Sequence, residues 1–284
     1  PERSEDDFCR NLQGPTLRIP RIITAVFLVA FMLGGLFYLP APYWPAFAAV
    51  IILPALWEWT RLFHITGLAQ VGYLGFSALM MYAVASTGQM PGAGMQVLSL
   101  LMWLVVAPLW LWQRWKLVDR NQAAMLGWLL LMPAWFALLA WRPGPEQGPA
   151  LLAVMALVWI ADTAAYFAGR AFGKHKLAPA ISPGKSWEGV AGGMLATGIY
   201  TLWVGHSGVF DFSLPWWGWL AAGWALTAVS VVGDLLESWF KRAAGVKDSS
   251  QLLPGHGGVL DRIDSLIAVL AVSQAARYLA TQWM

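Results

Sequence analysis

In a chain that is only 12% charged, residues 238–264 hold a dense set of side chains that could do chemistry. Basic groups come first, a Pro-Gly-His-Gly-Gly turn follows, and two aspartates close the stretch. Cations suit phosphate groups, and paired carboxylates suit a divalent metal. The pattern predicts a metal-assisted phosphate site at a membrane face. Its charged members are Lys241, Arg242, Lys247, Asp248, Asp261, Arg262 and Asp264.

The acids form two pairs with the same spacing. Asp261 and Asp264 are three residues apart at the start of an expected helix, and Asp234 and Glu237 repeat this spacing at the end of the preceding one. Residues three apart share a helix face, so antiparallel neighbouring helices can bring the pairs together. We expect a divalent-metal cage in which Asp234 and Asp261 are the first ligands and Asp264 and Glu237 support them. Helix capping is the alternative and could explain Asp261, which lies near a helix N-terminus. It does not explain Asp234 and Glu237, because acids are disfavoured near a helix C-terminus.

The basic residues and the histidine have competing interpretations. Lys241, Arg242 and Lys247 could anchor the membrane edge, although their setting favours phosphate binding for at least two of them, with Asp248 in support. Arg262 could clamp a phosphate or neutralise the neighbouring aspartates. Three glycines flank His256 and would let backbone N–H groups approach an anion, so both a catalytic and a structural role stay open for it.

A second polar stretch covers residues 170–189. Its Gly-Lys-Ser sequence is similar to the end of a P-loop, but Pro179 stands where the first glycine would be and no strand is expected before it. A P-loop is therefore excluded. Residues 182–188 still predict a phosphate-holding turn that opens a helix. Its candidate ligands are Ser182, Lys185, Ser186 and, in support, Glu188.

Two further acids fall within apolar segments. A carboxylate there costs about 2.5–3.5 kcal/mol on insertion scales, so it usually faces a bundle interior or a wet cavity. A structural hydrogen-bonding role is favoured for Glu58. Asp162 could be structural or could support the metal site.

Composition places the whole chain in a membrane. It is 58% hydrophobic, its mean hydropathy is +0.58, and its 19 tryptophans suit two membrane interfaces. The single cysteine, Cys9, excludes an intramolecular disulfide and a cysteine-based metal site. The pI near 9.1 is explained by basic cytoplasmic loops better than by nucleic-acid binding.

Apolar segments predict an all-α polytopic protein with about nine transmembrane helices. With the N-terminus in the cytoplasm, fifteen of the 18 lysines and arginines fall in cytoplasmic segments, and only Arg142 and Arg277 fall on the other side. The remaining one, Arg262, lies in the first turn of the ninth span on the cytoplasmic side. We therefore expect a periplasmic C-terminus. The predicted spans are 21–39, 43–63, 70–86, 95–112, 123–141, 149–169, 187–205, 216–238 and 259–280.

The same pattern predicts the domain organisation. Residues 1–17 form a polar tail that we expect to be disordered. Residues 18–284 form a single transmembrane catalytic domain, with cytoplasmic loops at 170–186 and 239–258.

These motifs resemble the phosphatidate cytidylyltransferase family, also called CDP-diacylglycerol synthases. The stretches 162–170 and 182–189 are similar to this family as well, so the resemblance covers at least residues 160–270. Residues 238–264 satisfy every fixed position of the family signature, namely Ser238, Lys241, Arg242, Lys247, Asp248, Ser250, His256, Gly257, Gly258, Asp261, Arg262 and Asp264.

The resemblance implies that CTP and phosphatidic acid react to give CDP-diacylglycerol and pyrophosphate, in phospholipid biosynthesis. It implies Mg²⁺, with room for a second cation, and a homodimer in the bacterial inner membrane whose site faces the cytoplasm. Lys185, Lys241, Arg242 and Lys247 would hold phosphates, with Ser238 beside them. We expect direct in-line displacement at the α-phosphorus of CTP.

Two alternatives stay open, one a related enzyme and the other a protein of a different class. A related CTP-dependent transferase acting on an isoprenoid lipid would need similar headgroup chemistry. An ion-coupled transporter would need charges near the midplane, and of the acids only Asp162 approaches that depth.

Overall fold

A computed structural model describes the backbone of residues 18–116 and 119–283, so the predicted tail at 1–17 lies outside the described residues. Helices follow one another along nearly the whole described chain. The elements are α2 (Arg18–Tyr38), η2 (Ala41–Tyr43), α3 (Trp44–Leu62), α4 (Leu68–Thr87), α5 (Ala93–Leu101), η3 (Met102–Val106), α6 (Ala107–Gln113), α7 (Arg120–Trp141), η4 (Pro145–Gln147), α8 (Gly148–Phe172), β1 (Lys176–Ala178), β2 (Ser182–Ser186), α9 (Trp187–Ser207), α10 (Trp216–Ala243) and α11 (Leu260–Trp283).

Each predicted span overlaps a helical segment of the described chain. The fourth is irregular: α5 and α6 are joined by the π-helical turn η3, next to Pro108, which cannot donate a backbone hydrogen bond. Length and composition qualify 6 helical stretches of the described residues as membrane spans. The protein is therefore a helical membrane protein, and the count of nine stays a prediction. The 6 stretches are Leu68–Thr87, Ala93–Gln113, Arg120–Trp141, Pro145–Phe172, Trp216–Ala243 and Leu260–Gln282.

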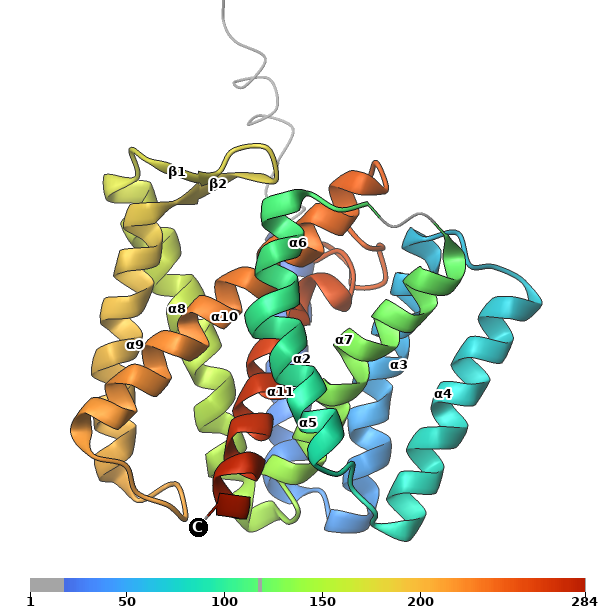
Figure 1. The fold of residues 1–284 in the computed structure, drawn as a ribbon, viewed down its shortest axis with the longest axis horizontal. Helices are drawn as coiled ribbons and strands as arrows, with labels where there is room; N and C mark the ends of the chain where they lie inside the picture. The colour runs from blue at the N-terminus through green and yellow to red at the C-terminus, as the bar shows by residue number, and fades with distance from the viewer. Residues whose placement is uncertain (1–17, 117–118, 284) are drawn as a thin grey trace, which may run out of the picture.

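The helices lie side by side in one bundle and alternate in direction (Figure 1). The two strands and the loop between α10 and α11 lie at the same end of this bundle, which we call the hairpin end. The C-terminus of α11 lies at the opposite end. Both polar stretches that the sequence singled out therefore meet at one end.

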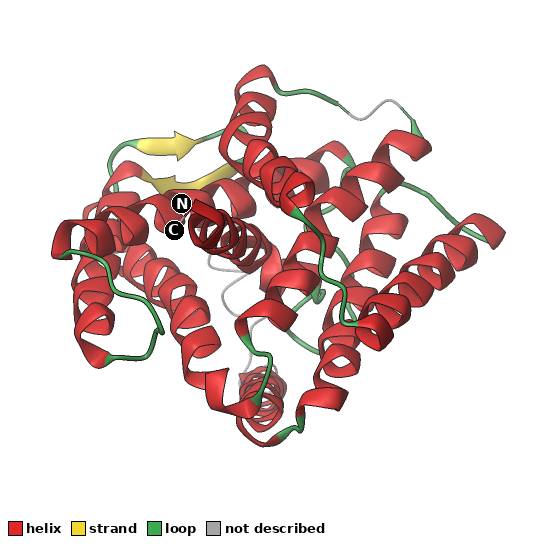
Figure 2. Cartoon of the chain, turned by 60° about the horizontal axis from the view of Figure 1, so that its bottom comes forward, coloured by secondary structure: helices red, strands yellow, loops and turns green. Residues whose placement is uncertain are grey.

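The strands are an addition to the expected all-helical fold (Figure 2). β1 and β2 pair antiparallel, with Lys176 opposite Ser186 and Ala178 opposite Ser182. The sequence did not indicate them, because residues 176–186 show no alternation of apolar and polar side chains. The pairing places Lys185 in a strand instead of a turn.

The core is centred on α7, which packs against α3, α5 and α11. The side chains of Leu131, Met132 and Trp135 are fully buried. The indole of Trp135 donates to Pro45 O at 3.3 Å, and that of Trp44 donates to Leu138 O at 2.9 Å. Buried indoles thus connect α3 to α7 by hydrogen bonds, and these two helices pack below the hairpin end.

Small residues let the helices that carry the site approach closely. A Cβ added to Gly192 of α9 would lie 2.3 Å from the Cβ of Ala168 on α8. A Cβ on Gly233 of α10 would lie 2.8 Å from the backbone oxygen of Asp264 on α11. The backbones of α10 and α11 can therefore meet next to Asp234 and Asp264 only because residue 233 has no side chain.

Candidate active site

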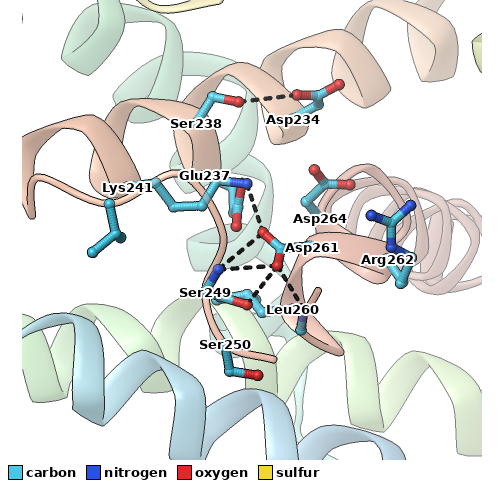
Figure 3. Close-up of polar contacts among 12 residues, drawn as sticks. Asp234, Glu237, Ser238, Lys241, Ser249, Ser250, Leu260, Asp261, Arg262 and Asp264 are labelled. Carbon is cyan, nitrogen blue, oxygen red and sulfur yellow. Dashed lines mark hydrogen bonds and ion pairs between the residues drawn. The ribbon is translucent and has the colours of Figure 1, made fainter. Parts of the chain in front are cut away.

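The candidate site lies at the hairpin end, where the last turns of α10 face the first turns of α11. The predicted loop 239–258 is shorter than expected, because α10 continues to Ala243. Lys241 and Arg242 are consequently helical residues in its last turn. Ser238 lies in the same helix, and the other signature residues follow in the loop 244–259 and at the start of α11. Figure 3 shows Ser238, Lys241, Ser250, Asp261, Arg262 and Asp264 among them.

Asp261 organises the loop that precedes it (Figure 3). Its carboxylate accepts hydrogen bonds from the backbone N–H of Gly258 at 2.7 Å and of Ser249 at 2.9 Å. The hydroxyl of Ser249 lies 3.0 Å from the same oxygen, and the ammonium of Lys241 lies 2.6 Å from the other. These bonds tie Asp261 to the loop that leads into α11, and Lys241 adds an ion pair.

Lys241 sits between two carboxylates instead of extending into solvent. Its ammonium lies 2.6 Å from Glu237 Oε2 and 2.6 Å from Asp261 Oδ1, and the residue is only 9% exposed. An ammonium has three N–H donors, so these two partners leave one for another acceptor. Phosphate binding by Lys241 stays a prediction that requires this remaining donor.

Glu58 of α3 contacts the candidate site, although the sequence did not indicate its partners. Its side chain is fully buried and accepts from the backbone N–H of Leu260 at 2.6 Å and of Val259 at 2.9 Å. It also accepts from the hydroxyls of Ser250 at 2.5 Å and Ser249 at 3.1 Å. The predicted hydrogen-bonding role is confirmed. The partners of Glu58 lie in the loop 244–259, which we call the signature loop, and at the N-terminus of α11, where a negative charge is favourable.

Lys185 connects the hairpin to α10. Its ammonium lies 2.5 Å from Asp234 Oδ2, and the hydroxyl of Ser238 donates to Asp234 Oδ1 at 3.3 Å. Both partners of this ion pair are about one-quarter exposed, so substrate groups can reach them. The two polar stretches identified in the sequence thus share a direct contact.

The predicted convergence of the two acidic pairs is present in the structure. Asp264 points from α11 toward Asp234 on α10 (Figure 3), and their charges interact. Glu237 interacts in the same way with Asp264 and Asp261, and Asp162 of α8 with Asp234 and Lys185. The cluster therefore holds five carboxylates against the ammonium groups of Lys185 and Lys241.

The described residues contain no group of three His, Cys, Asp or Glu side chains arranged around one metal position. The complete cage expected from both pairs is thus not preformed, because Lys241 and the loop amides already bind the oxygens of Asp261. The donor chemistry nevertheless fits Mg²⁺. Mg²⁺ typically uses one or two carboxylates together with substrate phosphates, and the Oε1 of Glu237 is buried without a hydrogen-bond partner in the described chain.

The other signature residues surround this cluster. Arg242, Lys247 and Asp248 are exposed, and Arg242 donates to Val246 O at 3.3 Å. Arg262 is exposed and donates from Nε to His256 O at 2.9 Å. No ion pair from Arg262 to the neighbouring aspartates is present among the described residues, so its guanidinium is available to an anion.

His256 has a buried ring atom without a partner. Its Nδ1 makes no hydrogen bond within the described chain, and its backbone N–H donates to Leu253 O at 2.9 Å. The backbone contacts fix the turn, and the unpartnered Nδ1 keeps the catalytic interpretation open.

The hairpin holds the remaining candidates. Ser186 is the N-cap of α9, and its Oγ accepts from Gly189 N–H at 3.2 Å. Glu188 lies 2.6 Å from Nδ1 of His175. Ser182 is half-buried and pairs with β1. The structure therefore gives Ser186 and Glu188 local partners, whereas Lys185 forms an ion pair with Asp234 of α10.

Comparisons with known proteins agree with the signature. A sequence model described as the cytidylyltransferase family matches residues 19–280. A protein of Pseudomonas aeruginosa named phosphatidate cytidylyltransferase is 41% identical over 270 residues, covering 92% of this chain and 97% of the relative. One of the same name from Haemophilus influenzae is 37% identical over 281 residues, covering 88% of this chain and 95% of the relative. One from Staphylococcus saprophyticus is 47% identical over 121 residues, covering 42% and 45%.

Proposed function

This chain belongs to the cytidylyltransferase family, and we propose that it transfers the cytidylyl group of CTP to phosphatidic acid. The products are CDP-diacylglycerol and pyrophosphate. The protein is a nucleotidyltransferase with membrane helices. The observation that carries the choice of substrates is the 41% identity, over 92% of the chain, to a relative named for phosphatidate.

The site supplies the charges that such a reaction needs. Two highly charged substrates must come together, and the contact between Lys185 and Asp234 joins the hairpin to α10, which carries part of the signature. Arg242, Lys247 and Arg262 add exposed cations around it. Cations that hold both phosphates reduce their repulsion and align them for attack.

The proposed step is one direct displacement. An oxygen of the phosphatidic acid phosphate attacks the α-phosphorus of CTP and forms a new phosphorus–oxygen bond. The bond from this phosphorus to the oxygen that bridges to the β-phosphorus breaks, and its electron pair leaves with pyrophosphate. The attacking phosphate is already anionic, so the chain does not need to supply a general base.

We propose that Asp234 and Asp264 hold the Mg²⁺ ion, with Glu237 and Asp162 beside them. When bound, Mg²⁺ would neutralise the triphosphate and polarise its reacting oxygens. Asp261 would act mainly by fixing Lys241 and the signature loop, since its oxygens already have protein partners. A second cation and a homodimer stay predictions.

We also propose that the hairpin end faces the cytoplasm of a bacterial inner membrane. The support is the concentration of lysines and arginines in loops that alternate with poorly charged ones. The alternating directions of the helices fit this arrangement (Figure 1). CTP is then taken from the cytoplasm and phosphatidic acid from the inner leaflet.

The test is a lipid-product assay with purified protein. Radiolabelled CTP, Mg²⁺ and either phosphatidic acid or an isoprenoid phosphate are supplied, and the lipid products are resolved. Labelled CDP-diacylglycerol is expected only with phosphatidic acid, and label in the isoprenoid product alone would reject the proposal. CTP made chiral with sulfur at the α-phosphorus should react with inversion; retention would indicate a covalent intermediate, with His256 as its candidate nucleophile.

A further inference from the structure

A separate cavity opens at the hairpin end, on the other side of α10 from the carboxylates. Its volume is about 330 Å³. Asp234, Ser238 and Lys241 recur at helical spacing on one face of α10, whereas Trp239 and Ala243 lie roughly half a turn away from them. The cavity is lined by Leu62, Phe63, His64, Trp115, Lys116, Asp119, Arg120, Trp239, Phe240, Ala243 and Ala244.

Aromatic side chains hold the wall of this cavity in place. The carbonyl oxygen of Trp115 accepts from the indole of Trp239 at 2.8 Å and from that of Trp110 at 2.9 Å. The rings of Trp110 and Phe240 meet edge to face at 5.6 Å. The wall is therefore formed by the protein's own contacts, and it does not depend on a ligand.

The cavity combines two basic side chains with apolar ones. Lys116 and Arg120 are exposed and supply its positive charge, whereas Leu62 and Phe240 are buried. The acid in the lining, Asp119, is engaged as the N-cap of α7, where its Oδ1 accepts two backbone N–H groups at 2.7 and 2.8 Å. An anionic group with an apolar attachment suits this combination.

The neighbouring surface suits an acyl chain. Exposed apolar side chains follow α5, η3 and α6 toward the middle of the bundle, beginning from the turn next to Trp115. They recur at helical spacing and form one exposed apolar strip. The members of this strip are Leu98, Leu101, Leu104, Val105, Leu109 and Trp112.

We propose that this cavity binds an anionic phospholipid, with its phosphate at Lys116 and Arg120 and its acyl chains along the strip on α5 to α6. The inference is independent of the proposed reaction, because binding needs neither CTP nor turnover. A basic residue next to an anionic headgroup adds favourable binding free energy. Losing both Lys116 and Arg120 should therefore weaken lipid binding by about tenfold or more. Phe240 lines the cavity and precedes Lys241 in the sequence, so the occupant and the carboxylate cluster would lie on different faces of the same turn of α10.

Native mass spectrometry of the purified chain in detergent tests the proposal. Phosphatidylglycerol and phosphatidylcholine with the same acyl chains are compared as probes, and glycerol phosphate is added as a headgroup without chains. The wild type should retain phosphatidylglycerol in preference. Lys116→Ala/Arg120→Ala should lose this preference, whereas Lys174→Ala/Lys176→Ala should keep it, since it removes the same charge from the exposed hairpin.

A second variant guards against a folding defect at the start of α7. Ala243→Trp keeps both basic residues and fills the cavity, so it should also lose the bound lipid. Unchanged phosphatidylglycerol binding in both pocket variants would overturn the proposal. Displacement of the lipid by glycerol phosphate at equal concentration would overturn it as well, because a free phosphate would then be the ligand.

Discussion

The carboxylate of Glu58 accepts a hydrogen bond from the backbone N–H of Leu260 at 2.6 Å, although 202 positions separate the two residues. The contact fastens the first turn of α11 to α3. Asp261 and Asp264 belong to this turn and the next, so their positions depend on a residue far outside the signature.

Glu58→Gln should weaken both stability and activity. The amide keeps the size of the side chain but replaces one acceptor oxygen with a donor that faces backbone N–H groups and serine hydroxyls. Leaving such buried groups unsatisfied costs about 1–3 kcal/mol. Thermal unfolding in detergent and turnover measure the two effects. Glu146→Gln makes the same change at an exposed position of the opposite end and should be near neutral; equal behaviour of the two variants would contradict the prediction.

Asp234→Asn should raise the Mg²⁺ concentration needed for half-maximal activity by at least about tenfold. The variant keeps the size of the side chain and removes one of the charges proposed to hold the metal. Activity is measured while Mg²⁺ is titrated at fixed CTP. Asp211→Asn removes a charge from the opposite end and should leave the titration unchanged. A wild-type titration curve for Asp234→Asn would remove this residue from the metal site.

Lys185→Ala should lower kcat/KM for CTP by roughly 10- to 100-fold, the range expected for one lost hydrogen bond between charged groups. Its matched control is Lys174→Ala, which removes an exposed lysine from the same polar stretch at residues 170–189. Steady-state kinetics with both substrates varied will show which of them loses the contact. If the two lysine variants behave alike, Lys185 is an ordinary membrane anchor.

Gly233→Ala should destabilise the protein by about 1–3 kcal/mol and reduce activity. The added methyl group would lie 2.8 Å from Asp264 O, so α10 and α11 must separate at the carboxylate cluster. Gly75→Ala in α4 is the control, because a Cβ there has no neighbour within 4 Å. That change should be neutral or stabilise the helix by up to about 1 kcal/mol. The idea fails if Gly233→Ala unfolds at the wild-type temperature with full activity.

A reporter fused after Met284 should be active only outside the cytoplasm. This outcome follows from nine crossings and a cytoplasmic N-terminus, which the distribution of basic residues predicts. The measurement pairs a reporter that works in the periplasm with one that works in the cytoplasm. A cytoplasmic signal after Met284 would reject the nine-span arrangement.

The sequence predicted the helices well, because a bilayer requires apolar segments of about 20 residues. It missed the last turn of α10, since Lys241 and Arg242 have the polarity of a loop but continue the helix. It also missed the strands at 176–186, whose pairing is a backbone property without an apolar pattern.

The sequence also predicted which residues gather at the site, through the spacing of Asp234, Glu237, Asp261 and Asp264 along two neighbouring helices. It could not predict how they pair. Lys241 forms ion pairs with Glu237 and Asp261, and Lys185 forms one with Asp234. The packing of the helices determines these pairs, and the sequence pattern does not contain it. Nothing local to Glu58 indicated that its partners would be Ser250 and Leu260.

The contact between α3 and α11 has a consequence for biogenesis. The ribosome synthesises α3 long before α11. Glu58 therefore lacks its final hydrogen-bond partners until almost the whole chain has been made. The neighbouring pair α8 and α9 can instead dock as soon as both helices have been inserted. Assembly of the site at the hairpin end is therefore a late event. A chain that stops before Leu260 should be inserted into the membrane but remain inactive.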